Sequence, residues 1–458
     1  MVYFNQHQLT QLSLFKKRAK HLRLSVFCLL FLTGCLDSPF FDARPYTAIL
    51  FTNNSEDSLL VSVDIDAPTS HWVQHATEIM PYQTKRLITL SRSINSSSVD
   101  YDYTITLTHP HGDQLSLIQN INNQNQKETL SFSIQSVDIN PPLIDENGYH
   151  RFISGYNTQL SSHSVISIKT HNKAVYQDLH YSLTPMPSGN FNSNQQGMHV
   201  LTYNVWGLPF VAQDIRPRFR LIPQYIKHYD VVLLQEVFDA SAIHLLNSLA
   251  EDYPYQTKIL DGPTANLFNG GVVIISKHPI VQEADKVFSA CNGADCLANK
   301  GVKYAEIVKD GEHFHFFATH LASFDSIESK NSRLHQLETI QQFIQRFSIP
   351  PHEKVIIGGD FNIDKVRFPE EYQAMLGYLG VDEPIFEGYK KSTFDTDING
   401  FSRLTSKSPQ YIDYIFMSNQ FGDYNSINNQ VFIPRSSDES LWGKWDLSDH
   451  FPVSAYIE

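Results

Sequence analysis

The N-terminus has no apolar run long enough to span a membrane as a helix. The run at residues 24–33 holds ten residues. At about 1.5 Å per helical residue, that length cannot cross a hydrocarbon core of about 30 Å. Five basic residues precede the run: Lys16, Lys17, Arg18, Lys20 and Arg23. A basic stretch before a short apolar run is typical of an export signal, so we predict that residues 1–34 are a signal peptide.

Cysteine is scarce, with four residues in a chain of 458. Cys28 lies within the predicted signal, so Cys35, Cys291 and Cys296 would remain after its removal. The stretch from Leu32 to Cys35 resembles a bacterial lipoprotein signal, in which the cysteine carries the lipid. An odd count is explained if Cys35 is lipidated and Cys291 pairs with Cys296 in an oxidising compartment. Cleavage by the general signal peptidase and two free thiols are the alternatives.

An excess of positive charge is also absent. The net charge is −13, and removal of the five basic residues of the signal takes it to −18. Proteins that bind nucleic acid by neutralising many phosphates carry the opposite balance, so we expect no nucleic-acid partner. The signal predicts an exported chain that is lipid-anchored through Cys35 to a bacterial outer membrane or cell surface, or is otherwise secreted.

Residues 46–183 show no long helical period. Turn-rich stretches separate segments in which apolar and polar residues alternate, such as 61–65, 103–107 and 130–134. This period of two is typical of half-buried strands. We therefore predict an all-β sandwich domain at residues 36–184. No constellation within it indicates chemistry, and its ligand is not identified by the sequence.

Residues 185–197 are rich in Pro, Gly, Asn and Gln, which is typical of a linker. Beyond them strands and helices mix. Runs of strand length stand at 199–204, 231–235, 272–276, 314–319, 354–358 and 411–416. Helical patterns occur at 240–251 and 328–347. We predict an α/β domain at residues 198–458.

Polar residues typical of a metal-assisted hydrolase stand at the ends of these strands. They are Asn204, Glu236, His320, Asp360 with Asn362, and the pair Asp449 and His450 before the last strand. Polar groups at the carboxyl ends of several buried strands converge on one edge of a sheet, where α/β proteins build their sites. A single residue of this kind is more often a turn or capping residue, but the whole set predicts a functional site.

The motifs around these residues are, in order, TYNVWG, LLQEVF, ATHLAS, GGDFN, YIDYIF and SDHFPV. Together they resemble the endonuclease/exonuclease/phosphatase superfamily. Longer stretches look like the bacterial neutral sphingomyelinases, which are sphingomyelin-specific phospholipases C: LLQEVFDASAIHLLNSLAEDYPYQT, NGGVVIISKHPI and CNGADCLANKG. The resemblance covers residues 198–458. It implies a deoxyribonuclease-like α/β fold, a four-layer sandwich of two β-sheets flanked by helices, here preceded by the all-β sandwich.

The resemblance and the chemistry of phosphodiesters together imply a metal cofactor. Attack on a phosphodiester must overcome the negative charge of the phosphate, so a hard divalent cation with oxygen ligands is expected. Mg²⁺ suits such a site, and Mn²⁺ or Co²⁺ could replace it. The resemblance implies that Glu236 and Asn204 form the metal site together with Asp449, with His450 close by.

The resemblance also assigns catalytic roles. His450 is the general base of the superfamily, because an imidazole takes a proton readily near neutral pH. Its sequence neighbour Asp449 is a poor partner, since adjacent residues entering a strand tend to point to opposite sides. By resemblance Asp413 of YIDYIF orients the ring. The remaining roles implied are positioning of water by Asp360, a phosphate contact by Asn362, and a second donor at His320.

Two departures from the sphingomyelinases are visible. These relatives carry a second metal site at the edge of the fold, which uses an Asn and a Glu-Asp pair where this chain has Ala240 and Phe268-Asn269. Loss of both carboxylates removes most of the charge that would hold a divalent ion. We expect this edge site to be absent or weak.

The second departure concerns membrane contact. The relatives insert an aromatic-tipped hairpin before the final SDH motif, whereas residues 434–445 of this chain are short and partly acidic. Trp442 and Trp445 are suited to a membrane interface, where one end of the ring is apolar and the other wet. We expect them to contact a membrane, and the alternative is that both pack onto the protein.

The sequence therefore predicts Mg²⁺-dependent hydrolysis of sphingomyelin in a membrane, releasing ceramide and phosphocholine. The alternative within the superfamily is another phosphodiesterase or phosphatase, acting on phospholipid, phosphoinositide or nucleic acid. Phosphoinositide phosphatases have a Trp-Cys-Asp-Arg run where this chain has Tyr411 to Tyr414. A non-catalytic lipid binder is a third possibility, but every expected site residue is present.

Overall fold

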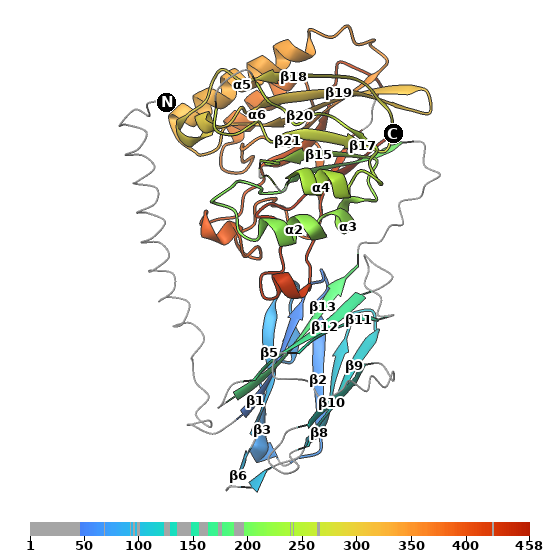
Figure 1. The fold of residues 1–458 in the computed structure, drawn as a ribbon, viewed down its shortest axis with the longest axis vertical. Helices are drawn as coiled ribbons and strands as arrows, with labels where there is room; N and C mark the ends of the chain where they lie inside the picture. The colour runs from blue at the N-terminus through green and yellow to red at the C-terminus, as the bar shows by residue number, and fades with distance from the viewer. Residues whose placement is uncertain are drawn as a thin grey trace.

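The computed structural model describes residues 46–67, 69–91, 93–94, 97–98, 101–122, 129–134, 148–154, 164–172, 176–186, 197–238, 240, 242–262, 266–423 and 426–458. The predicted signal peptide, Cys35 and most of the predicted linker lie outside these residues. Figure 1 shows a β-rich part, drawn in blue to green, below a larger part in which strands and helices mix.

Two sheets form the N-terminal β-rich region, residues 46–186. One has the order β11-β12-β13-β1-β5-β3 and the other β10-β9-β8-β2-β4. The first contains β1 (Tyr46–Asn53), β3 (Trp72–Gln74), β5 (Thr84–Ser91), β11 (Tyr149–Ser154), β12 (Ser164–Asn172) and β13 (Tyr176–Pro185). The second contains β2 (Leu59–Ile65), β4 (Glu78–Ile79), β8 (Tyr101–Thr108), β9 (Gln114–Asn122) and β10 (Thr129–Ile134). A small pair, β6 (Ser93–Ile94) and β7 (Ser97–Ser98), and a 3-10 turn, η1 (Thr69–His71), complete the region.

The alternation read from the sequence explains this packing. Strand β8 buries every second residue, with Tyr101, Tyr103, Ile105 and Leu107 facing inward. They pack in one cluster with Ile49, Phe51, Leu87, Ile166 and Tyr181 of the other sheet. The β-rich character predicted for this part of the chain is therefore observed.

Two further sheets form the C-terminal part. The first has the order β16-β17-β15-β14-β25-β24-β22 and the second β18-β19-β20-β21-β23. The first contains β14 (Met198–Asn204), β15 (Val231–Gln235), β16 (Tyr255–Gln256), β17 (Val273–Ser276), β22 (Ile385–Glu387), β24 (Asn428–Val431) and β25 (Val453–Ile457). The second contains β18 (Ile280–Val287), β19 (Gly301–Lys309), β20 (Glu312–His320), β21 (Lys354–Asp360) and β23 (Asp413–Met417).

Helices cover the outer faces of these sheets. They are α2 (Ile215–Leu221), α3 (Pro223–Ile226), α4 (Ala242–Ser248), α5 (Ile327–Ile344) and α6 (Pro369–Leu379), with 3-10 turns η3 (Gly293–Leu297), η4 (Ser402–Leu404) and η5 (Glu439–Leu441). Ser326 caps the N-terminus of α5, because its Oγ accepts from the backbone N–H of Ser329. Gly380, in the left-handed region, caps the C-terminus of α6. Within the described part of the chain, no helix is long and apolar enough to cross a membrane.

The two C-terminal sheets pack face to face. Val200, Leu233 and Ile274 of the first share one buried cluster with Ala305, Phe316 and Ile356 of the second. Leu337, Ile340 and Phe343 of α5 join that cluster. Phe219 and Leu221 of α2 and Leu245 of α4 pack against Leu201 and Val232. Helices, sheet, sheet and helices therefore form four layers, and the predicted fold is confirmed.

Candidate active site

The two facing sheets bring the predicted site residues to one edge. The first sheet supplies Asn204 at the end of β14, Glu236 directly after β15, and Asp449 and His450 shortly before β25. The second supplies His320, Asp360 and Asp413, which stand at the same level on adjacent strands: His320 pairs in register with Asp360, and Asp360 with Asp413. All of these side chains except that of Glu236 are at most 5% exposed. They form one buried cluster between the sheets.

His450 is held by a carboxylate from another strand. Its Nδ1 lies 2.9 Å from Oδ2 of Asp413, and the edge of Phe394 packs against the ring at 5.0 Å between centroids. Burial works to lower the pKa of His450, but the charges of Asp413 and Asp360 outweigh it and hold that pKa well above its ordinary value. The Nδ1 bond fixes the ring and leaves Nε2 as the nitrogen available for proton transfer.

Asp360 lies at the centre of the cluster. Its Oδ2 accepts from Nδ2 of Asn204 at 3.1 Å, and it lies 3.5 Å from Nε2 of His320 and 3.8 Å from Nε2 of His450. Its Oδ1 accepts from the backbone N–H of Asn362 at 3.0 Å. Burial and the neighbouring charge of Asp413 raise the pKa of Asp360 to about 6. One carboxylate thus contacts residues from both sheets.

Glu236 has a free oxygen. Its Oε1 accepts from Nδ2 of Asn204 at 3.2 Å, while Oε2 is buried and has no hydrogen-bond partner among the described residues. Its backbone has φ 59°, a conformation that non-glycine residues seldom adopt outside functional sites. Burial raises the pKa of Glu236, and burial with the charge of Glu236 raises the pKa of Asp449 to about 7.

These carboxylates fit a hard cation. Glu236, Asp360 and Asp449 are buried together, their pKa values are raised by that burial, and one oxygen of Glu236 points to no partner. Buried charges are normally neutralised by a partner ion or a metal. Asp360, Asp413 and His450 also form a compact group, with ligand atoms within 4.8 Å of one another. In that group Nδ1 of His450 already bonds Asp413, whereas Oε2 of Glu236 has no partner among the described residues.

Asn204 is placed differently from a simple ligand. Its Nδ2 faces the carboxylates of Glu236 and Asp360, and its Oδ1 accepts from the backbone N–H of Trp206 at 3.0 Å. In this orientation Asn204 joins the two carboxylates and does not offer its oxygen to a cation. The resemblance implied that Asn204 is part of the metal site, but it carried no information on the hydrogen bond to Trp206 that orients the amide.

Comparisons with known proteins place the chain in a family. The profile of the Endonuclease/Exonuclease/phosphatase family matches residues 201–450. Sphingomyelinase C from Listeria ivanovii is 34% identical over 295 residues, covering 59% of this chain and 87% of that protein. Sphingomyelinase C from Bacillus cereus is 36% identical over 295 residues, covering 57% and 88%. A crystal structure of a Staphylococcus aureus beta toxin mutant with bound magnesium ions matches with TM-score 0.52 at 30% identity, covering 57% of this chain and 100% of that one.

The family match spans more than half of the chain, and it contains the whole site. This chain belongs to the endonuclease/exonuclease/phosphatase family. With relatives named sphingomyelinase C, it is a phosphodiester hydrolase of that family. The match begins at residue 201, so it does not include the N-terminal β-rich region.

This family member also contains a buried lysine that the sequence analysis missed. Nζ of Lys300 lies 3.1 Å from Nε2 of His320 and 2.8 Å from Oδ1 of Asp295. Since an ammonium can only donate, Nε2 of His320 accepts and its Nδ1 carries the proton. Burial, Lys300 and His450 lower the pKa of His320 well below its ordinary value. The signal that could have revealed Lys300 was its place in the stretch CNGADCLANKG.

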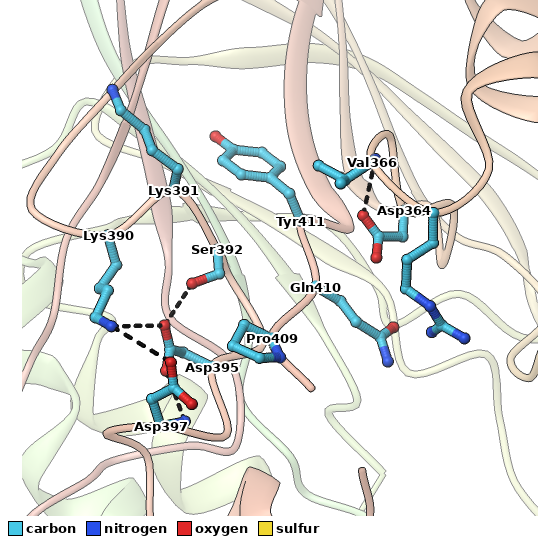
Figure 2. Close-up of a pocket in the computed structure, with 11 residues that line it drawn as sticks. Asp364, Val366, Lys390, Lys391, Ser392, Asp395, Asp397, Pro409, Gln410 and Tyr411 are labelled. Carbon is cyan, nitrogen blue, oxygen red and sulfur yellow. Dashed lines mark hydrogen bonds and ion pairs between the residues drawn. The ribbon is translucent and has the colours of Figure 1, made fainter. Parts of the chain in front are cut away.

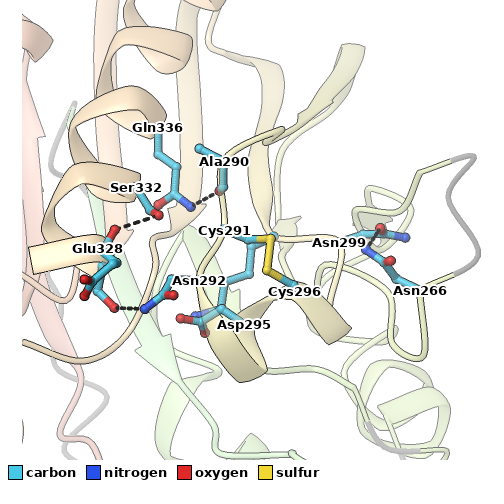
Figure 3. Close-up of a disulfide and its surroundings, with 12 residues drawn as sticks. Asn266, Ala290, Cys291, Asn292, Asp295, Cys296, Asn299, Glu328, Ser332 and Gln336 are labelled. Atoms are coloured by element: carbon cyan, nitrogen blue, oxygen red, sulfur yellow. Dashed lines mark hydrogen bonds and ion pairs between the residues drawn. A yellow bond between two sulfur atoms is a disulfide. The ribbon is translucent and has the colours of Figure 1, made fainter. Parts of the chain in front are cut away.

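A disulfide encloses the turn that carries Asp295. Cys291 and Cys296 form the disulfide, and the residues beside them bond helix α5 (Figure 3). Nε2 of Gln336 in this helix donates to the carbonyl of Ala290 at 2.8 Å, and Asn292 donates to Ser329 of the same helix. The bond therefore lies one residue from the carboxylate that pairs with Lys300. The turn that the disulfide closes therefore contacts the buried site through Asp295.

Replacing both cysteines of this bridge by serine should have a modest effect on stability. Closing so short a loop removes little entropy from the unfolded chain, and we expect the free energy of unfolding to fall by about 2 kcal/mol. Urea denaturation of the double variant measures this change, with reduced wild-type protein as the control. A loss above about 5 kcal/mol would show that the bridge does far more than close a loop.

A pocket of about 240 Å³ lies beside the strand that carries Asp413. Tyr411, Gln410 and Asp364 line it, together with Arg367, Lys390, Lys391, Ser392, Asp395 and Asp397. Figure 2 shows Lys390 paired with Asp395 and Asp397, at 3.8 and 3.6 Å. The family enzyme thus has a polar pocket two residues along the chain from the carboxylate that orients His450.

The two tryptophans expected at a membrane pack inside the protein instead. Trp445 is 6% exposed, and Trp442 is half-buried. Trp442 contacts the rings of Tyr149 and His180 of the β-rich region at 5.9 and 5.1 Å, and Trp445 contacts His180 at 5.7 Å. Packing of these rings onto the protein was the alternative left open by the sequence, and here the β-rich region covers them. In this structure they are not presented to a lipid surface.

The ring of His180 between these tryptophans makes the contact sensitive to acid. Burial lowers the pKa of His180 to about 4, from an ordinary value of 6.5. The unfolded chain then binds more protons than the folded chain between these values, so this contribution to stability is complete above pH 6.5 and is lost as the pH falls towards 4. The full effect is about 3 kcal/mol.

Unfolding of wild type and His180→Gln at pH 7 and pH 5 measures this effect. The advantage of wild type should shrink at the lower pH, because only the wild-type ring takes up a proton. A difference between the two proteins that does not change with pH would contradict the assignment.

Proposed function

We propose that the chain hydrolyses sphingomyelin to ceramide and phosphocholine, by in-line attack of water on phosphorus with Mg²⁺ as its cofactor. The observation that carries this proposal is the bond between His450 and Asp413, facing Asp360 at an edge shared with Glu236. The substrate is supported by the relatives named sphingomyelinase C, and the ion by the beta toxin with bound magnesium ions.

His450 acts as the general base. Asp413 holds Nδ1, so Nε2 takes the proton from the attacking water. Oδ2 of Asp360 lies 3.8 Å from that nitrogen, too far for a direct hydrogen bond, and faces the same space. Asp360 therefore orients the water towards phosphorus while Nε2 receives its proton.

His320 and Asn362 act on the oxygens of the phosphate and of the leaving group. Nδ1 of His320 is buried and has no partner among the described residues, so its N–H can donate a hydrogen bond to a phosphate or leaving oxygen and stabilise negative charge there while the neutral ring keeps its proton. Lys300 holds the ring in that tautomer through Nε2. Asn362, at φ 52°, would contact a phosphate oxygen through its amide, which in this structure donates from Nδ2 to the carbonyl of Leu321 at 3.3 Å.

Glu236 and Asp449 would hold the ion, with Glu236 offering its free Oε2. Mg²⁺, or Mn²⁺ or Co²⁺ in its place, would supply positive charge that offsets the charge of the phosphate. Asn204 keeps the carboxylates of Glu236 and Asp360 together by donating to both. In this arrangement its role is to position the ligand carboxylate.

Another substrate of the same family is the alternative. Hydrolysis by purified protein of sphingomyelin, phosphatidylcholine, a phosphoinositide and duplex DNA tests it directly. We expect sphingomyelin to be cleaved with the highest kcat/KM. Faster cleavage of any of the other three substrates would replace the proposed substrate and leave the hydrolytic machinery unchanged.

The chain acts at a sphingomyelin-containing membrane, after export with lipid at Cys35 or as a secreted protein. Cys35 lies outside the described residues, so this part rests on the sequence alone. Metabolic labelling with a fatty acid tests the anchor, and a Cys35→Ser variant should lose the label.

The second metal site of the relatives should be absent or weak. Phe268 packs against Phe238 at 6.0 Å, and Asn269 uses its Oδ1 to accept from the backbone of Gly271. Neither side chain offers a carboxylate. We expect metal analysis after equilibration with Mn²⁺ to give about one ion per chain, reduced in Glu236→Gln. Two ions per chain, with one retained in that variant, would contradict this prediction.

A further inference from the structure

Arg435 connects the N-terminal β-rich region to the C-terminal part. The side chain is 4% exposed. Its guanidinium lies over the ring of Tyr82 at 5.0 Å, and one nitrogen donates to the carbonyl of Tyr82 at 3.2 Å and to Oδ1 of Asn54 at 3.4 Å. Its Nε donates to Oδ1 of Asp446 at 2.8 Å, and its third nitrogen to the carbonyl of Ile398.

The hydrogen bonds of the Arg435 guanidinium are complete only when both parts are in place, although Asp446 of the C-terminal part pairs its charge. Asp446 is 1% exposed, and its second oxygen accepts from the backbone N–H of Gly400 at 2.9 Å. A buried ion pair stabilises a structure only if its remaining donors and acceptors are also paired. Two of the acceptors of Arg435 belong to Asn54 and Tyr82, so the β-rich region completes this network.

Asp446 is close in the chain to the site. The carbonyl of Leu447 accepts a hydrogen bond from the guanidinium of Arg218 at 2.9 Å. The hydroxyl of Ser448 donates to the carbonyl of Asn204 at 2.6 Å. Nδ2 of Asn399 donates to the carbonyl of Ser448 at 2.8 Å. Every residue from Asp446 to Ser448 is thus hydrogen-bonded, and this short stretch leads directly into Asp449 and His450.

The β-rich region holds the same segment, residues 434–446, at further points. The hydroxyl of Tyr149 donates to the carbonyl of Ser437 at 2.8 Å, and Oγ of Ser167 lies 2.9 Å from Oγ of Ser437. The Trp442 ring packs on His180. Figure 1 shows this segment, in red, reaching from the upper part to the ends of the β-rich strands. The contact is therefore broad.

We propose that Arg435 is a positioning residue through which the N-terminal β-rich region fixes Asp449 and His450 in their working geometry. The region is then part of the catalytic architecture and not a detachable spacer. This inference rests on the proposed function in taking His450 as the base. It assigns to the region a role that the family match, which begins at residue 201, does not include.

Variants of Arg435 in the full chain test the proposal. Arg435→Gln removes the charge, and Arg435→Lys keeps the charge but cannot reach Asp446, Tyr82 and Ile398 at once. On a water-soluble phosphodiester with Mg²⁺, we expect kcat to fall between about 10- and 100-fold in the glutamine variant, with KM within about twofold, because a small displacement of a catalytic group is costly. The lysine variant should recover part of the loss. Arg346→Gln, an exposed arginine after α5, is the matched control.

Hydrogen exchange reports the same link without substrate. Amides of residues 446–451 should exchange faster in Arg435→Gln than in wild type or the control. Folded Arg435→Gln with wild-type kcat and wild-type exchange would overturn the proposal. If wild type cleaves no phosphodiester, the proposed function fails, and exchange still decides whether Arg435 positions the segment.

A second variant covers the case in which Arg435→Gln does not fold. Asn54→Ala removes an acceptor that the β-rich region offers to Arg435 and leaves the bonds of Arg435 to Asp446 and Ile398 in place. We expect kcat to fall severalfold at unchanged KM, with faster exchange at residues 446–451. Unchanged kcat and exchange in this folded variant would likewise overturn the proposal.

Discussion

Replacing His450 by glutamine is expected to lower kcat by about 10²- to 10⁴-fold, the usual contribution of general acid–base catalysis. Glutamine can still bond Asp413, so the cluster keeps a hydrogen bond at that point, but it cannot take a proton from water. KM should change little, because the imidazole acts on the reacting water and contributes little to binding of the lipid. Steady-state hydrolysis of sphingomyelin micelles measures both quantities.

His335→Gln is the control for this variant. His335 is exposed on helix α5, and its ring bonds the carbonyl of Asn331 at 2.8 Å. Its replacement should leave kcat unchanged. A His450→Gln protein that is folded and retains more than a tenth of wild-type kcat would show that another group is the base, and Asp360 would be the first to examine.

Replacing Glu236 by glutamine is expected to have an effect of similar size through the ion. The change keeps the shape of the side chain and the contact with Asn204, but removes the charge that would hold a divalent cation. We expect the affinity for Mn²⁺ to fall by at least about 100-fold and kcat/KM at fixed Mg²⁺ by about 10³-fold or more. Titration of the metal by calorimetry and kinetics at increasing Mg²⁺ measure these changes.

Glu338→Gln serves as the matched control for this charge change. Glu338 is an exposed residue of α5 that bonds only Gln342. If Glu236→Gln bound Mn²⁺ as tightly as this control and wild type do, the ion would have to lie elsewhere. The group formed by Asp360, Asp413 and His450 would then be the alternative site.

Much of the site could be predicted from the sequence, because strand ends carry strong signals. His320, Asp360 and Asp413 lie at the ends of buried strands, and neighbouring strands place such residues at one level. The alternation of side chains in an extended chain argued against Asp449 as the partner of His450. The resemblance to the family pointed to Asp413, whose Oδ2 lies 2.9 Å from Nδ1 of His450. The period of two therefore predicted the β-rich region, whereas the central contact of the site was predicted from the resemblance.

Other features depend on packing that no local pattern encodes. Lys300 reaches His320 from the turn closed by the disulfide, so its role depends on how that turn lies against the strands. The orientation of the Asn204 amide follows from the hydrogen bond to Trp206. Trp442 and Trp445 have the composition of a membrane contact, yet the β-rich region covers them. Each outcome depends on a partner distant in the sequence.

Release of phosphocholine from sphingomyelin vesicles, with Mg²⁺ and with chelator, tests the central claim most directly. Protein from residue 35 onward should release phosphocholine with Mg²⁺, lose that activity with chelator and regain it when Mg²⁺ is restored. Folded protein that releases no phosphocholine with Mg²⁺ present, or releases it equally in chelator, would contradict the account of a metal-assisted sphingomyelin hydrolase.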